Sequence, residues 1–505
     1  MLNHYPFHIL EPAEALVKIQ SSEHGQRIFL SPCDQPIKQV RIAWRFDTSF
    51  MTQVLADTWG VALADLEWRS LPLEHAAQWY FAAYDGTHTH CFGVKTGCNS
   101  FCSWEITDEG VTLCCDVRNG GEGVLLTDTL LCAETVYYKS VDGQTPYAAC
   151  QTFCQMMCDK SSYPDRPIYG FNTWYYTYGN ITKASVLEDA RLCARLASRV
   201  GADAPRPFMV IDDGWNRNRG GGYNGGPFVP TDDFGDMAEV ARQIREIGCE
   251  PGIWVRPLVV LEDLCPDIPA ECYSENQDYP DRGKVLDPTT EGTQRYIREL
   301  ISGLVKSGYR LIKHDFTCPD LMGLDFLAPN VTRDGWHWHD KSKTNAQVCK
   351  ELYTLIQEAA EGAYVIGCNI YNHLAAGIHD IVRSGCDTSG EHWHITRDYG
   401  VNTLAFRTYQ NRAFFMTDPD CAAFTKHVPI ELNMQFSELI AMSDQAFFIS
   451  AAPDVLTQSD EERLMELFRR IVQGGSDLEP LDWMERRVPK AFYADGQTRQ
   501  YEWDE

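Results

Sequence analysis

The sequence is short of positive charge. It contains 44 Lys and Arg residues against 71 Asp and Glu residues, which gives a formal net charge of −27. Phosphate backbones and anionic membrane surfaces are repelled by a chain of this charge. The balance therefore argues against a nucleic-acid-binding protein, and it discriminates only weakly among neutral and cationic ligands.

Long apolar runs and low-complexity tracts are lacking as well. No window approaches the 18 uncharged apolar residues of a membrane-spanning helix. The first residues, MLNHYPFHILEPAEALVKIQ, do not join a basic region to an apolar stretch as a secretion signal does. We therefore expect a cytoplasmic protein with no membrane partner. Its 44% hydrophobic and 23% charged residues are close to the globular average, which allows a large buried core.

A disulfide framework is also lacking, although the chain has 19 cysteines. Their number is odd and they are scattered through apolar runs, which is typical of a reducing compartment. Cys150, Cys154 and Cys158 recur at helical spacing. Three thiols on one helix face without a fourth ligand are more often core packing than a metal site. We expect neither a metal ion nor a cofactor.

Two parts of the chain differ in their hydrophobic rhythm. Residues 26–143 show short β-type runs separated by turn signals such as Asp85-Gly86, which predicts an antiparallel β domain. After the linker-like segment SSYPDRP, apolar strand-like runs alternate with amphipathic helices, as in a (β/α)8 barrel. Eight such runs begin near Ile168, Phe208, Glu250, Arg310, Ala363, Asp380, Ala413 and Gln445.

The predicted fold is of the α/β class, a (β/α)8 TIM barrel with an N-terminal antiparallel β domain and a small C-terminal β appendage. A barrel takes about 250 residues, so 505 residues leave room for smaller flanking domains. We expect the N-terminal domain and linker at residues 1–160, the barrel at residues 161–475 and the appendage at residues 476–505.

Charged residues stand at the ends of several predicted strands, where a TIM barrel has its active site. Three runs end in this way, with Asp212 and Asp213, with Lys313 and Asp315, and with Arg383 and Asp387. Lys313 and Asp315 are two residues apart, so on a strand they share a face and can both enter the barrel mouth. Taken alone, Asp-Asp-Gly is also an ordinary turn, and Lys313 with Asp315 can be a structural ion pair.

Two of these carboxylates suit the cleavage of a glycosidic bond. That reaction needs one carboxylate to attack the anomeric carbon and one carboxylic acid to protonate the departing oxygen. The charge of Lys313 keeps Asp315 ionised, as a nucleophile requires, whereas a desolvated Asp387 retains its proton, as an acid requires.

Six motifs together resemble a known family. GFNTW, IDDGW, PGIW, LIKHD, RSGCD and TDPDC follow one another over about half of the chain. This set is similar to the barrel of the clan that holds melibiases (α-galactosidases), α-N-acetylgalactosaminidases and raffinose synthases. The resemblance implies a retaining exo-glycosidase that hydrolyses terminal α-galactosides in an oligosaccharide or glycoconjugate, with Asp315 as nucleophile and Asp387 as acid/base.

The resemblance also implies sugar-binding roles. Asp212 and Asp213 would bind the 4- and 6-hydroxyls of a terminal galactose, Trp174 and Trp254 would flank the ring, and Lys313 would contact neighbouring hydroxyls. A sugar whose hydroxyl points in the wrong direction would leave a buried carboxylate without its hydrogen bond, which is unfavourable. The site would therefore discriminate a sugar with an axial hydroxyl from one with an equatorial hydroxyl. Core packing is the alternative role of the two tryptophans.

Further positions follow the same pattern. Arg383 lies four residues before Asp387, as the arginine of the clan precedes its acid/base. Asp418 and Asp420 of TDPDC match a motif that supports the site, although Asp-Pro-Asp is also an ordinary turn.

The chain departs from the clan where the 2-substituent of the sugar is read. It has GCNIYNH there, so Cys368, Asn369 and His373 are candidates for contacts to the 2-substituent. The preference among galactose, N-acetylgalactosamine and arabinopyranose stays open. Arg256 and the loop EHWHITRD are candidates for the aglycone subsite. The N-terminal domain is shorter than that of large bacterial members, so a homo-oligomer is left open.

Other functions remain as alternatives. TIM barrels also host metal-dependent hydrolases and isomerases, and two loop pairs resemble ligands, His337 with His339 and Asp340, and His392 with His394. A non-catalytic carbohydrate-binding protein could use the same hydroxyl-reading residues, although it has no use for a proton donor opposite a nucleophile. A transglycosidase shares the glycosyl-enzyme with a hydrolase and differs only in the attacking group.

Overall fold

The N-terminal domain is built on an antiparallel β-sheet. The computed structural model describes residues 2, 5–61, 66–220, 222–277, 283–323, 331–475 and 477–504. Within them the sheet has the order β1-β4-β10-β9-β7-β8-β11-β3-β2, with β5 paired to β6 and β7. Its strands are β1 (Phe7–Glu11), β2 (Val17–Ser21), β3 (Gln26–Leu30), β4 (Gln39–Arg45), β5 (Gln53–Asp57), β6 (Trp68–Arg69), β7 (Ala77–Tyr84), β8 (Thr89–Val94), β9 (Phe101–Thr107), β10 (Gly110–Asp116) and β11 (Leu130–Lys139).

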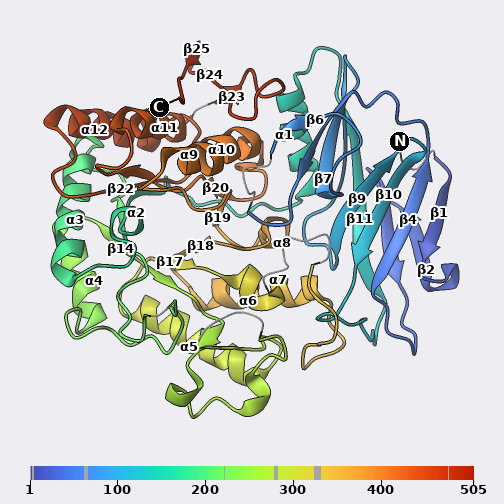
Figure 1. Cartoon of the computed structure of the whole chain (residues 1–505), viewed down its shortest axis with the longest axis horizontal. Helices are drawn as coiled ribbons and strands as arrows, with labels where there is room; N and C mark the ends of the chain where they lie inside the picture. Colours follow the sequence, from blue (N-terminus) through green and yellow to red (C-terminus); the bar gives the residue numbers. More distant parts are fainter. Residues whose placement is uncertain are drawn as a thin grey trace.

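The second part is a parallel barrel that lies beside this sheet (Figure 1). Its strands are β12 (Tyr169–Asn172), β13 (Phe208–Ile211), β14 (Glu250–Val255), β17 (Leu311–His314), β18 (Tyr364–Gly367), β19 (Ile381–Arg383), β20 (Met416–Asp418), β21 (Ala422–Phe424) and β22 (Phe447–Ala451). The seventh predicted run holds both β20 and β21, and the second of these pairs with β22. A hydrogen bond from Ala446 N to Thr417 O (3.0 Å) completes the closure, so the predicted TIM barrel is confirmed.

The barrel strands are connected by helices, the longer of which cover the outside of the barrel (Figure 1). They are α1 (Pro146–Met157), which precedes the barrel, then α2 (Trp174–Thr177), α3 (Lys183–Leu196), α4 (Met237–Ile247), α5 (Glu291–Lys306), α6 (Thr317–Met322), α7 (Asn345–Ala359), α8 (Asn372–Ala375), α9 (Trp393–Thr396), α10 (Asn402–Arg407), α11 (Ile430–Ala441) and α12 (Gln458–Gln473). The chain ends in the expected small sheet of β23 (Glu479–Pro480), β24 (Ala491–Ala494) and β25 (Gln497–Gln500). A second small pair, β15 (Val259–Val260) and β16 (Lys284–Val285), lies in a barrel loop.

Successive side chains along the barrel strands belong alternately to an apolar core inside the barrel and to one outside it. Leu311 belongs to the apolar cluster inside the barrel, while the next residue, Ile312, packs in the cluster outside it. Because successive side chains of a strand point to opposite faces, Lys313 and Asp315 continue the inner row at the mouth. His314 continues the outer row and lies fully buried behind the strand.

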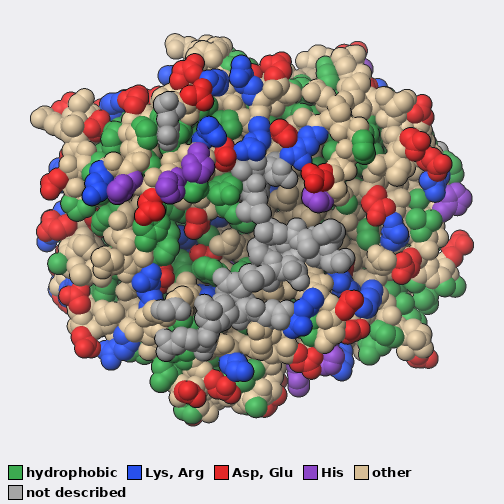
Figure 2. Space-filling model, viewed as in Figure 1, with side chains coloured by type: hydrophobic (Ala, Val, Ile, Leu, Met, Phe, Trp, Pro, Cys, Tyr) green, Lys and Arg blue, Asp and Glu red, His purple; other side chains and the backbone are tan. Residues whose placement is uncertain are grey.

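Two further features of the chain bear on the sequence predictions. Among the described residues, no helix is both long and apolar enough to cross a bilayer. All 19 cysteines fall within the described residues as free thiols, and most of them are buried. Figure 2 shows acidic and basic side chains interspersed over one face of the molecule.

A pair of neutral histidines lies behind β17. Nε2 of His314 is 2.9 Å from Nε2 of His379, and Nδ1 of His379 is 3.1 Å from Oε1 of Gln357. Because the Gln357 amide donates to Asp380 through Nε2 (2.9 Å), its oxygen faces His379 and accepts from Nδ1. His379 then accepts through Nε2 from His314. Burial lowers the pKa of His314 to about 4 and that of His379 well below its usual value.

We predict that these histidines make the fold sensitive to acid. Their pKa values are lowered in the folded protein, so their contribution is complete above the ordinary histidine value of about 6.5 and is lost as the pH falls below it. Each buried histidine then reduces the free energy of unfolding by about 1.4 kcal/mol per pH unit. Denaturant unfolding between pH 7 and 4.5 measures this slope.

The substitution His379→Gln should flatten the slope, because the unfolded chain then takes up one proton fewer at low pH. The matched control is His392→Gln at an exposed position, where the slope should stay as in the original protein. An unchanged slope in His379→Gln would contradict the prediction.

Candidate active site

A single pocket gathers the strand-end residues at the mouth of the barrel. It encloses about 360 Å³, counting the space at its opening. Its walls are Trp174, Tyr175, Asp212, Asp213, Asn224, Trp254, Lys313, Asp315, Phe316, Asn369 and Asp387. The predicted site residues that line it therefore come from the C-terminal ends of six strands and from the segments directly after them, which the barrel brings to one place.

Asp315 is held rigidly at one side of this pocket. Its Oδ2 accepts a hydrogen bond from Trp254 Nε1 (3.0 Å), and its Oδ1 accepts from Asn369 Nδ2 (2.7 Å) and from the backbone N–H of Phe316 (2.6 Å). Burial raises the pKa of Asp315, but the charge of Lys313 and these three donors outweigh it and lower the pKa below its usual value. Asp315 is therefore an ionised carboxylate with a fixed direction.

The backbone beside Asp315 is strained. Phe316 has φ of 64° and Asn369 has φ of 48°, in the left-handed region that side chains other than glycine seldom occupy. Arg256 stabilises this conformation, since its guanidinium lies 4.6 Å from the centre of the Phe316 ring and pairs with Asp320. Such strain persists only where the surroundings fix it, and it is frequent at active sites.

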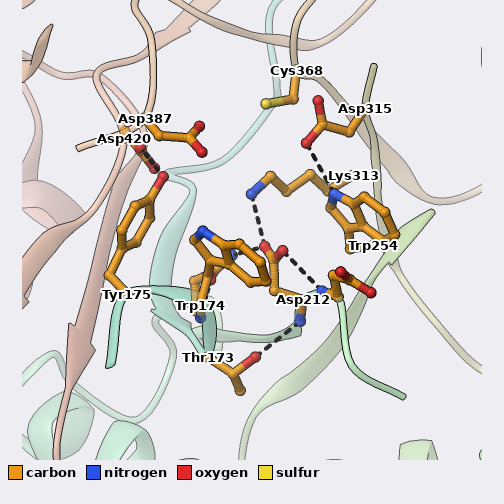
Figure 3. A network of polar contacts seen from close by, with 12 residues as sticks. Thr173, Trp174, Tyr175, Asp212, Trp254, Lys313, Asp315, Cys368, Asp387 and Asp420 are labelled. Atoms are coloured by element: carbon orange, nitrogen blue, oxygen red, sulfur yellow. Dashed lines mark hydrogen bonds and ion pairs between the residues drawn. The ribbon is translucent and has the colours of Figure 1, made fainter. Parts of the chain in front are cut away.

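A buried ion pair forms the floor of the pocket. Lys313 Nζ donates to Asp212 Oδ2 (2.7 Å), which also accepts from Asn172 Nδ2 (2.7 Å). Burial would lower the pKa of Lys313, but the Asp212 carboxylate raises it well above its usual value. Figure 3 shows the lysine amine between the Asp212 carboxylate and the carboxyl groups of Asp315 and Asp387.

Asp213 forms the adjoining part of the wall. Its Oδ2 accepts from Arg219 Nε (2.9 Å), and Arg219 also donates to Tyr178 O (2.9 Å). Burial raises the pKa of Asp213 to about 6, although Arg219 lowers it. Gly179, with φ of 84°, leaves the space for this guanidinium, because a Cβ there would lie 2.2 Å from Arg219 Nη2.

Asp387 faces Asp315 from the opposite wall. Arg383 Nη2 donates to its Oδ1 (3.2 Å) and pairs with Asp420 (2.8 Å), which also accepts from the Tyr175 hydroxyl. The Asp387 side chain is 56% exposed, to the pocket that surrounds it. Desolvation in this recess raises the pKa of Asp387 despite Arg383, and the negative charges of Asp420 and Asp315 raise it further.

Eight of the ten predicted site residues line the pocket, and two lie behind it. Arg383 is 1% exposed and reaches Asp387 through its guanidinium. Cys368 is buried, and its sulfur is 3.3 Å from Arg383 Nη1. The further candidate His373 does not line the pocket: α8 turns it toward the N-terminal sheet, where it stacks on Trp79 (5.0 Å) and binds Val94 O (2.8 Å).

Sequence reasoning missed three of the lining residues. Tyr175 and Phe316 directly follow predicted site residues, and their places depend on the local turn of the backbone. Asn224 comes from the glycine-rich loop RNRGGGYNGG, where its Oδ1 accepts from Arg256 Nη1 (2.8 Å). The sequence indicated that Asn224 could reach the site only through the position of this loop, which directly follows the strand that ends in Asp212 and Asp213.

The loop histidines do not line the pocket. The ring Nδ1 of His337 is 3.0 Å from Trp338 O, and the backbone N–H of His339 donates to Asp287 Oδ2 (2.7 Å). Across the part of the chain that the structure describes, no three His, Cys, Asp or Glu side chains are arranged to hold a metal ion.

The fold is that of known α-galactosidases. No protein-family model matches the sequence. The α-galactosidase TtGalA of Thermus thermophilus, solved with p-nitrophenyl α-D-galactopyranoside, superposes with a TM-score of 0.64 and 16% identity over 98% of this chain and 99% of that one. The GH36 α-galactosidase AgaA of Geobacillus stearothermophilus gives 0.62 and 14% over 94% and 74%. The α-galactosidase of Lactobacillus brevis gives 0.58 and 11% over 95% and 73%.

At these identities the likeness shows the fold, a TIM barrel with an N-terminal β domain as in GH36 α-galactosidases. The resemblance that the six motifs predicted is confirmed at this level.

We predict that Lys313→Met raises the pKa of Asp315 by about 1 to 3 units, because the opposing charge is lost while burial remains. Carbon NMR of ¹³C-labelled aspartate carboxyls measures it, with the Asp315 signal assigned from Asp315→Asn. Trp254→Phe is the control, since it removes one hydrogen-bond donor and should shift the pKa less in the same direction. A titration midpoint unchanged by Lys313→Met would refute the electrostatic role of Lys313.

Proposed function

We propose that the protein is a retaining exo-glycosidase that hydrolyses terminal α-galactosides by double displacement. Asp315 attacks the anomeric carbon, and Asp387 protonates the departing oxygen. In the second step Asp387, now ionised, takes a proton from water, and that water releases the sugar from Asp315.

One observation carries this proposal. Asp315 and Asp387 face each other across one pocket, and their pKa values are shifted in opposite directions. A lowered pKa keeps the nucleophile ionised, and a raised pKa keeps the acid protonated. Carboxyl groups with opposite shifts are the arrangement by which one site performs both steps.

The other walls suit a terminal galactose. Asp212 and Asp213 offer neighbouring carboxylates to adjacent hydroxyls, and Lys313 adds a donor beside them. Trp174 and Trp254 provide aromatic surface for the apolar side of a pyranose. The pocket volume of about 360 Å³ accords with one sugar bound at the chain end rather than a long saccharide within the pocket.

The neighbours in fold support the choice of substrate. They include α-galactosidases solved with p-nitrophenyl α-D-galactopyranoside, with stachyose and with raffinose. We therefore propose an α-linked galactose-containing oligosaccharide or glycoconjugate as the substrate, with water as the acceptor in preference to a second sugar.

The proposal predicts that the protein hydrolyses p-nitrophenyl α-galactoside and releases α-galactose first, as NMR of the anomeric proton would show. Asp315→Asn should reduce the rate to background, and Asp387→Asn should reduce kcat/KM for α-galactosides with unactivated leaving groups by about 10²–10⁴-fold. Asp189→Asn is the control, because Asp189 is a buried carboxyl outside the pocket that binds the Tyr176 hydroxyl. Initial release of β-galactose would exclude a retaining mechanism.

The opposite pKa shifts also predict a bell-shaped pH profile of kcat/KM. Asp315 acts only when ionised, so activity should fall below its lowered pKa, and Asp387 acts only when protonated, so activity should fall above its raised pKa. Asp387→Asn should abolish the alkaline limb and leave the acid limb. If both limbs persist in this variant, another group supplies the proton.

A further inference from the structure

Arg407 joins the N-terminal sheet to the active-site side of the barrel. This α10 residue is 1% exposed, and its Nε donates to Asp57 Oδ1 (3.0 Å). Its Nη2 donates to Thr58 Oγ1 (2.8 Å), and its Nη1 donates to Gly60 O (3.0 Å). The same Nη1 donates to Ser384 O (2.6 Å), at the end of β19. One guanidinium thus joins Asp57, Thr58 and Gly60 of the N-terminal domain to Ser384 of the barrel.

The barrel partner lies at the start of the turn that carries Asp387. Ser384 follows Arg383 directly, and its N–H donates to Asp418 O (2.9 Å) of the neighbouring strand. Arg383 reaches forward within the turn to Gly385 O (3.3 Å) and to Asp387 (3.2 Å). Asp387 has a short side chain, so its place in the pocket depends on the backbone of this turn. Arg407 therefore supports that backbone from the side away from the pocket.

Asp57 is specially oriented to hold Arg407. The pairing of β5 with β7 shifts in register between Ala56 and Asp57, and such a bulge redirects a side chain. Asp57 is 6% exposed, and its second oxygen accepts from Gln410 Nε2 (2.8 Å). Arg407 and the backbone N–H of Thr58 thus bind one oxygen of this carboxylate, and Gln410 binds the other. A buried arginine held in this way has little freedom to move away from Ser384.

We propose that Arg407, oriented by Asp57, is a positioning residue for the acid/base carboxyl, so that the N-terminal sheet controls protonation of the leaving group. The inference rests on the proposed function of Asp387. Neither Arg407 nor Asp57 touches the pocket, and their effect passes through the turn from Ser384 to Asp387.

The test compares two α-galactosides with different leaving groups. A dinitrophenyl galactoside leaves without protonation, whereas methyl α-galactoside requires the proton. Arg407→Lys keeps a positive charge but lacks the fork that reaches Asp57 and Ser384 together. It should reduce kcat/KM on the methyl galactoside on the order of 10- to 100-fold, with less than about a threefold loss on the dinitrophenyl galactoside.

The matched control is Arg118→Lys. Arg118 is also buried, pairs with an aspartate, Asp116, and crosses from the N-terminal domain to the barrel at Thr332 O (3.2 Å). It should change both rates by the same factor. Circular dichroism and thermal unfolding verify that each variant is folded, and Asp57→Asn provides the same test if Arg407→Lys does not fold.

Each outcome has a distinct meaning. Equal losses on both substrates in folded Arg407→Lys or Asp57→Asn, as in the control, would overturn the inference. A loss of kcat/KM confined to the methyl galactoside, together with a shift in the pH at which activity falls on the alkaline side, would support it. Asp387→Asn is the reference: if it lacks leaving-group selectivity, the proposed function of Asp387 fails independently of Arg407.

Discussion

The site depends on one buried cation. Lys313 lies in a pocket with the carboxylates of Asp212, Asp315 and Asp387, and it bonds directly to the first of these. Several like charges cannot share a desolvated recess unless a counter-charge offsets their repulsion. The lysine lowers the pKa of Asp315, whereas burial raises the pKa of Asp387 despite the neighbouring Arg383. The opposite pKa shifts of two identical side chains therefore follow from the different burial and charges around each of them.

Around this cation the barrel combines rigidity with local strain. Asp315 accepts three hydrogen bonds, and the residues that supply two of them, Phe316 and Asn369, are in left-handed conformations. Asp420, which pairs with Arg383 behind the opposite wall, is left-handed as well, with φ of 73°. Unfavourable backbone conformations of this kind persist because the packed barrel fixes them. They direct short side chains to points that a regular strand cannot reach.

The N-terminal domain contacts the barrel through segments that are far apart in the sequence. Arg407 bonds to Asp57 across 350 positions of the sequence, and Asn119 bonds to the backbone of Asp340 and Lys343 beyond the fourth barrel strand. Gly121 allows this close approach, because a Cβ there would lie 2.0 Å from Arg333 O. The sheet is thus a structural support for the barrel loops as well as a separate layer.

Much of the site was predictable because strand periodicity is a local property. Lys313 and Asp315 follow Leu311 at intervals of two, so the sequence alone places them on the inner face, and the strand-end positions of Asp212 and Asp387 follow from the order of apolar runs. Asn224 and the displacement of His373 from the pocket were not predictable, because a glycine-rich loop and a short helix can turn in many directions. The sequence by itself determined the barrel and the residues at its mouth. The tertiary structure alone decided in which direction the pKa of each carboxyl is shifted and which arginine bonds to the turn before Asp387, since these depend on charges and packing between segments far apart in the chain.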